Sequence, residues 1–197
     1  MQVERNARRG RRILMALVLL FVAPVVASYL AYYVIRPQGG TASYGSLIEP
    51  QRPIPAGFVV QDQSGRRMPL SALQGKWLFV MTDRSACDDA CARKLYEMRQ
   101  VRALQNTERG RVTMVWLRSD AMPVPARVAA AYPDTRALIA DPAAIAAWLP
   151  AEAGTTAADH LYLVDPLGHL MMRFPRDPDP ERIEADLARL LKWSGIG

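Results

Sequence analysis

The sequence predicts an α/β domain, with a central mixed sheet flanked by helices, after one N-terminal transmembrane helix. Two observations support this fold class. Apolar runs of strand length alternate with helical patterns after residue 57, which is typical of a sheet covered on both faces. An uncharged run over residues 13–35 precedes them, and its 23 positions exceed the about 20 that a bilayer core requires. Residues 57–197 are numerous enough to bury a single core.

The apolar run over residues 13–35 predicts an uncleaved membrane anchor, because a secretory signal has a shorter apolar region of about 7–15 residues. Residues 1–12 contain five arginines and one acid, Glu4. Positively charged flanks stay in the cytoplasm, so we expect a cytoplasmic tail over 1–12. A single-pass protein of the bacterial inner membrane would then have its domain in the periplasm, where disulfides persist. A cleaved signal and a paired-arginine export signal at Arg11 and Arg12 are the alternatives.

The formal net charge of +6 does not indicate a nucleic-acid partner. The chain has three lysines, so almost all of its basic charge is arginine. Part of that charge flanks the anchor, and the rest is scattered without a basic run. A solvated, arginine-rich surface is the simpler interpretation, and we expect no nucleic acid among the partners.

Residues 36–56 are rich in proline, glycine and small polar residues, and this composition predicts a semi-extended linker. Leu47 and Ile48 within it are apolar enough to dock on the domain. A short strand is expected at 58–60. The segment Trp77–Met81 is apolar at every position, which is typical of a strand buried on both faces.

Helices and strands then alternate to the end of the chain. The stretch from about Asp88 to Leu104 has helical composition, with apolar residues at i, i+3 spacing and acids at its start. The turn Asp165–Gly168 separates two strands of a closing hairpin. The further elements expected are a strand at 112–117, a helix at 124–131, a strand at 137–139, a helix at 142–149, hairpin strands at 161–164 and 169–174, and a final helix starting at 179–180.

Cys87 and Cys91 are the only cysteines, and they follow the apolar strand at C-x-x-x-C spacing. Two such thiols can close a disulfide or supply two soft ligands to one metal ion. A disulfide needs Cβ atoms about 3.5–4.5 Å apart, closer than the about 5–6 Å between i, i+4 neighbours on a helix. Oxidation therefore requires Cys87 to lie off the helix, and the residues alone leave both uses open.

The segment Gly75–Val80 before C-x-x-x-C, a strand that ends in Asp165–Gly168, and a closing hairpin with a terminal helix resemble the thioredoxin superfamily. Within it, the three-residue spacer resembles the Sco/SenC copper proteins. The resemblance covers roughly residues 45–193. It implies a thioredoxin-like Sco/SenC-type periplasmic domain over 57–197 and a role in cytochrome c oxidase assembly. The implied partners are an oxidase subunit or other assembly factors at the inner membrane.

Copper is the cofactor that this resemblance implies, with Cys87, Cys91 and His160 as its ligands. Soft thiolates favour copper(I), and an added imidazole accommodates copper(II). Met81, next to the cysteine segment, is a possible secondary contact. His169 follows the hairpin turn and is expected to be a surface strand residue.

The chain departs from the Sco/SenC pattern at two places. Proline typically follows both cysteines in that family, whereas Asp88 and Ala92 follow them here. His160 stands five residues before Asp165, about three closer than the family's histidine. An odd shift would place a strand residue on the other face of the sheet.

Three functions fit these residues. The first is a metallochaperone that binds copper through Cys87 and Cys91 and delivers it to an oxidase subunit. The second is an enzyme, a thiol–disulfide oxidoreductase with the same two cysteines as catalytic residues, which keeps the cysteines of the oxidase copper site reduced. The third is a non-catalytic assembly scaffold in which the cysteines form a structural disulfide.

Overall fold

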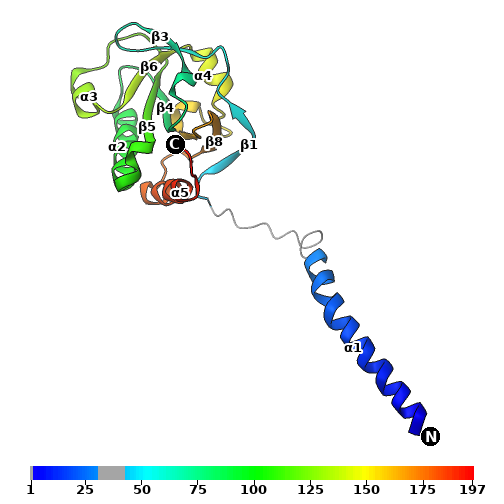
Figure 1. The fold of residues 1–197 in the computed structure, drawn as a ribbon. Coiled ribbons are helices and arrows are strands. Elements are labelled where there is room, and N and C mark those ends of the chain that lie inside the picture. Colours follow the sequence, from blue (N-terminus) through cyan, green and yellow to red (C-terminus); the bar gives the residue numbers. More distant parts are fainter. Residues whose placement is uncertain (1, 31–42) are drawn as a thin grey trace. The chain divides into compact units, whose positions relative to one another are not determined.

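The computed structural model describes residues 2–30 and 43–197, and the chain divides into two compact units, 1–42 and 43–197 (Figure 1). In the first unit, helix α1 spans Gln2–Leu30. Its part Arg11–Leu30 is long and apolar enough to cross a membrane and is not buried within the protein. The expected anchor over 13–35 is thus helical from residue 13 to residue 30, and residues 31–35 lie outside the described residues.

The second unit is built on an eight-stranded mixed sheet in the order β1-β8-β7-β4-β5-β6-β2-β3. Its strands are β1 Ser46–Pro53, β2 Val59–Gln61, β3 Arg67–Pro69, β4 Trp77–Asp83, β5 Val112–Arg118, β6 Arg136–Ala140, β7 Leu161–Val164 and β8 His169–Arg173. The α-helices are α2 Asp89–Leu104, α3 Ala126–Ala131, α4 Pro142–Trp148 and α5 Pro180–Trp193, with short 3₁₀ helices η2 Leu70–Leu73, η3 Asn106–Arg111 and η4 Ala157–Asp159.

Strand β4 lies at the centre of the sheet, parallel to β5 and antiparallel to β7. Its side chains alternate between two buried layers. Phe79 and Met81 pack on the face covered by α2 and α5, whereas Leu78 and Val80 pack on the face covered by α4 (Figure 1). Burial on both faces explains why residues 77–81 of this strand are all apolar. The predicted mixed sheet with flanking helices is confirmed.

Strand β1 lies inside the segment 36–56, which has the composition of a linker. It pairs antiparallel with β8, and Ile48 packs in the core. The expected linker is therefore corrected for residues 46–53, which belong to the sheet, while residues 36–42 lie outside the described residues. The composition does not indicate this strand because its pairing partner, β8, comes from the other end of the domain.

Arg111 joins η3 to the end of α5. Its guanidinium donates hydrogen bonds of 2.6–3.0 Å to four main-chain carbonyl oxygens and to one carboxylate. These acceptors, which include helix-end carbonyls that lack intrahelical partners, are Leu191, Ser194, Ile196, Gly197 and Glu108.

We expect Arg111→Ala to destabilise the domain by about 2–3 kcal/mol, because several acceptors lose a charged donor at once. The midpoint of thermal unfolding should fall by about 4–12 °C for a domain of this size. Near-ultraviolet circular dichroism of the full-length chain in detergent measures it. Arg109→Ala is the matched control, since Arg109 is exposed on the same 3₁₀ helix. An equal effect of both substitutions would contradict the capping role.

Candidate functional site

Cys87 and Cys91 form a disulfide at the start of α2. Cys91 lies in the first turn of the helix, and Cys87 lies in the preceding loop with φ of 46°, in the left-handed region. Because the helix begins at Asp89, Cys87 is off the helix, as a disulfide at this spacing requires. The structure thus brings the two predicted cysteines together.

The residue after Cys87 caps the helix. The carboxylate of Asp88 accepts a hydrogen bond of 3.0 Å from the N–H of Cys91, and its carbonyl oxygen accepts one of 2.9 Å from Ala92. The N–H of Cys87 donates to the carbonyl oxygen of Arg84 at 3.2 Å. Asp88 therefore supplies the cap of α2. Its negative charge also lies beside the cysteines.

The disulfide is buried. Cys87 is 2% exposed and Cys91 is 0% exposed. Both belong to the core cluster under α2, together with Met81 and Leu95. A partner can therefore reach the sulfur atoms only when the cysteine loop, residues 84–88, moves.

The cysteine loop is tied to the end of β5. Buried Ser85 donates its N–H to the Asp120 carboxylate at 3.2 Å and accepts a hydrogen bond of 3.1 Å from Arg118. Arg118 also donates to the carbonyl oxygen of Met122 at 2.9 Å. Hydrogen bonds from Ser85 and Met122 hold the pKa of Asp120 below its usual value, and burial lowers the pKa of Arg118.

A second set of contacts, made by Lys94, connects the end of β4 with η4, the short helix before β7. Lys94 on α2 forms an ion pair of 2.8 Å with Asp83 at the end of β4. The same ammonium donates to the carbonyl oxygen of Ala158 in η4. The side chains of Lys94 and Asp83 are largely buried. The two contacts of Lys94 therefore fix the start of α2 against η4.

His160 is fully buried, and both of its ring nitrogens have protein partners. Nδ1 lies 2.9 Å from the carbonyl oxygen of Phe174, and Nε2 lies 2.7 Å from Thr155 Oγ1. Because a carbonyl oxygen only accepts, Nδ1 carries a proton. Thr155 Oγ1 also lies 2.9 Å from the carbonyl oxygen of Glu152, and its single proton serves only one of these two contacts. His169, by contrast, is half-buried beside the hairpin turn, 3.2 Å from Asp165.

The alternation of side chains along β7 separates His160 from the cysteines. Leu161 and Leu163 pack in the cluster that contains the disulfide. His160 instead lies against Tyr162, with ring centroids 6.3 Å apart, and Tyr162 packs on the opposite face. In the parts of the chain that the structure describes, no three His, Cys, Asp or Glu side chains are placed to hold a metal ion. His160 as a third ligand stays a prediction that requires a rearrangement.

The sequence did not draw attention to Ser85, Arg118 and Asp120 as neighbours of the cysteines. The available signal was a charged residue, Arg118, at the end of the apolar run 112–117. Such a residue is solvated in most proteins, and its burial becomes evident only when the β5 end and the cysteine loop are seen together.

Comparison with known proteins supports the fold. Residues 77–194 match the family described as "Transmembrane-like, thioredoxin-like, C-terminal domain". No curated protein sequence matches the chain.

Several solved Sco structures share its fold. Apo Sco1 from Thermus thermophilus matches with a TM-score of 0.60 and 22% identity, over 75% of this chain and 96% of that chain. Copper-bound yeast Sco1 matches with a TM-score of 0.58 and 17% identity, over 77% and 90%. BsSco, described as having a disulfide switch and as one of the Sco cytochrome c oxidase assembly proteins, matches with a TM-score of 0.55 and 16% identity, over 73% and 96%. At these identities the likeness establishes the thioredoxin-like fold.

Proposed function

We propose that this chain, which belongs to the transmembrane-like, thioredoxin-like C-terminal domain family, is a membrane-anchored, Sco-like assembly protein. The fold that it shares with solved Sco proteins supports this proposal. We propose further that it acts by thiol–disulfide exchange through Cys87 and Cys91 and keeps the cysteines of an oxidase copper site reduced. The disulfide at the start of α2 carries this proposal. The fold shared with BsSco, a cytochrome c oxidase assembly protein, supports the choice of target.

The exchange follows from the places of the two sulfur atoms. In the reduced protein, the thiolate of Cys87 attacks a disulfide of the partner, and one partner sulfur leaves as a thiolate. Cys91 then loses its proton and attacks Cys87 Sγ, which releases the second partner thiolate. Two electrons pass to the partner, and this protein ends with the Cys87–Cys91 disulfide. Cys87 is assigned the attack because it lies in a loop, and Cys91 the resolving step because the helix holds it.

Copper(I) binding is the second candidate, and the convergence of two sulfur atoms favours it. Once reduced, two thiolates can hold copper(I) as cargo for delivery. The copper-bound Sco structures with this fold support the possibility. His160 would add to a copper(II) site only after its hydrogen bond to Thr155 breaks.

A redox titration tests the proposal. The full-length chain in detergent is equilibrated with glutathione or dithiothreitol buffers, and free thiols are counted by alkylation and mass spectrometry. We expect the pair to change between dithiol and disulfide at a potential above about −300 mV, the value below which structural disulfides lie. A pair that stays oxidised below that potential would leave only the scaffold function. Copper(I) is then added to the reduced chain and the bound metal is measured. Retention of copper(I) is required only by the second candidate function, copper delivery, and not by thiol–disulfide exchange.

We also propose the periplasmic orientation of the domain. The five arginines of residues 1–12 should keep the N-terminus in the cytoplasm. Alkaline phosphatase fused after Gly197 should therefore be active, and a fluorescent reporter that folds only in the cytoplasm should be dark. The reverse result would refute this orientation.

A further inference from the structure

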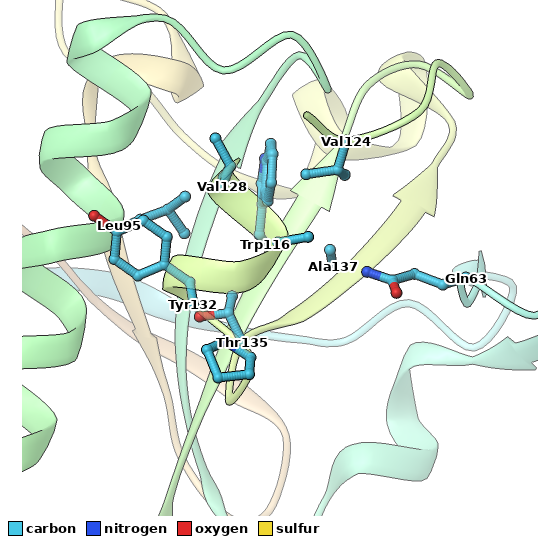
Figure 2. A pocket seen from close by; sticks show the side chains of 10 residues that line it. Gln63, Leu95, Trp116, Val124, Val128, Tyr132, Thr135 and Ala137 are labelled. Atoms are coloured by element: carbon cyan, nitrogen blue, oxygen red, sulfur yellow. The ribbon is translucent and has the colours of Figure 1, made fainter. Parts of the chain in front are cut away.

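A cleft with two lobes lies beside the cysteine segment, between the turn that joins β2 to β3, the end of β5, and helix α3. One lobe has a volume of about 280 Å³ and the other about 360 Å³. Gln63, Val124 and Ala129 line both lobes, so the two lie next to each other. Figure 2 shows the first lobe, with Gln63 at one side and Tyr132 at the other.

The first lobe is mainly apolar. The indole of Trp116 stands between Val124 and Val128, and Leu95 from α2 and Ala137 from β6 complete the wall (Figure 2). A space of this size and lining fits one large apolar side chain. The second lobe differs in character, because two charged residues, Arg118 and Asp62, lie in its wall. Asp62 is already paired with Arg66 at 3.3 Å, whereas Arg118 forms no ion pair in the described part of the chain.

Unpartnered polar atoms gather around this cleft. Six buried side-chain nitrogen or oxygen atoms in the described parts of the chain lack a hydrogen-bond partner, and three of the six belong to residues that line the cleft. They are Trp116 Nε1 and Thr135 Oγ1 in the apolar lobe and Arg118 Nε in the other. Trp116 is 2% exposed and Arg118 is 4% exposed. Because buried polar groups in proteins are almost always paired, this clustering points to a ligand that supplies acceptors.

The charge of Arg118 points the same way. Its two hydrogen bonds go to neutral acceptors, the hydroxyl of Ser85 and the carbonyl oxygen of Met122. Within residues 43–197, no carboxylate lies close enough to Arg118 to form an ion pair. The nearby Asp120 instead accepts hydrogen bonds from Ser85 and Met122. Asp120 therefore interacts with Arg118 through its charge but does not bond to it. The guanidinium keeps an unpartnered Nε, which can donate to a carboxylate from outside the chain.

We propose that the cleft binds an extended segment of a partner protein, with a large apolar side chain in the first lobe and a carboxylate against Arg118. In an extended chain, residues two apart point to the same side, so an apolar residue, any residue and an acidic residue match the two lobes. Carbonyl oxygens of the segment supply acceptors for Trp116 Nε1. This site goes beyond the proposed exchange chemistry and does not depend on it.

Two residues that line the cleft form hydrogen bonds to the chain on either side of the cysteines. Arg118 donates to Ser85, two residues before Cys87. The hydroxyl of Tyr132 donates to the carbonyl oxygen of Ala92, the residue after Cys91, at 3.3 Å. A bound segment would therefore contact residues that are hydrogen-bonded to the chain on either side of the two cysteines.

Nuclear magnetic resonance of the full-length chain in detergent tests this site with the probe acetyl-Phe-Gly-Asp-amide. The indole N–H resonances of Trp77 and Trp148 serve as internal controls, because these nitrogens are also buried and unpartnered but do not line the cleft. We expect a saturable downfield shift of the Trp116 indole N–H alone. Replacing the probe's aspartate by asparagine should weaken binding about tenfold, the value of one charge-assisted hydrogen bond.

Two exposed positions on α3 give a matched pair of variants. Ala129→Leu fills the neck shared by the lobes and should abolish the Trp116 shift. Ala130→Leu places the same side chain on the same helix outside the cleft and should leave the shift unchanged. No saturable shift up to about 10 mM probe, or an equal shift in Ala129→Leu, would overturn the proposal. So would equal binding of acetyl-Ala-Gly-Asp-amide, since it would show that the apolar lobe is not used.

Discussion

Cys91→Ser is expected to trap a mixed disulfide with an oxidised partner, and Cys87→Ser is expected to form none. If Cys87 attacks and Cys91 resolves, loss of the resolving thiol stops the reaction at the covalent complex. Loss of the attacking thiol prevents the first bond, because Cys91 is held in the first turn of α2, whereas Cys87 lies in the loop before it. The measurement is mass spectrometry of the full-length variants mixed with an oxidised peptide that carries two cysteines at the spacing of an oxidase copper site.

Both variants should also lose copper(I) binding, since one thiolate makes a poor site for this ion. Unfolding does not explain such a loss. A disulfide that closes so short a loop contributes about 2 kcal/mol by the chain-entropy relation, a fraction of the about 5–15 kcal/mol of a typical domain. Circular dichroism of each variant checks that the fold persists. Equal trapping by both variants would remove the division of roles, and trapping by neither would favour the structural disulfide.

His160 offers a separate test of the metal site. His160→Ala should leave copper(I) affinity unchanged, because the two sulfur atoms hold this ion, and should weaken copper(II) binding if the ring joins the site. Thr155→Val is the matched control, because it removes the hydrogen bond to Nε2 and retains the ring. Copper(II) affinity that is equal in the wild type and in His160→Ala would exclude the histidine from the site.

The central part of the fold is predictable because its signals are local. The segments 77–81 and 161–164 are continuous apolar runs, 112–117 is apolar except at Thr113, and they lie in β4, β7 and β5 respectively. The condition for the disulfide is also local. At the spacing of Cys87 and Cys91, a disulfide can form only when one of the two cysteines lies outside the helix. Local patterns do not place His160, because the face it occupies depends on where β7 begins and on its bond to Phe174.

The cleft and strand β1 could not be predicted, because both depend on contacts between distant parts of the chain. The walls of the cleft extend from Gln61 to Ile139. Strand β1 is held by β8, and the residues just before it are held by α5, both more than 100 residues later in the sequence. A proline-rich segment contains no sign of such partners, so its composition indicates a linker.

Asp186 is the contact that fixes the entry of the chain into the domain. It is 4% exposed on α5, and one carboxylate oxygen accepts hydrogen bonds from the N–H groups of Tyr44 at 2.7 Å and Gly45 at 2.9 Å. The Tyr44 ring lies under the guanidinium of Arg182, 4.1 Å from ring centroid to cation, and its hydroxyl accepts from the N–H of Asp179. The segment before β1 is therefore bound along α5 at several points.

Asp186→Ala should destabilise the domain by about 3–5 kcal/mol, because two N–H groups lose a charged acceptor and one of them is buried. The midpoint of thermal unfolding should fall by about 10 °C, and the amides of residues 46–53 should exchange with deuterium faster than those of β4. Asp186→Asn keeps one acceptor oxygen and should lose about half as much. Glu184→Ala, on the same helix, is the control and should change neither quantity by a comparable amount. Unchanged exchange over residues 46–53 in Asp186→Ala would show that pairing with β8 holds this strand without the carboxylate.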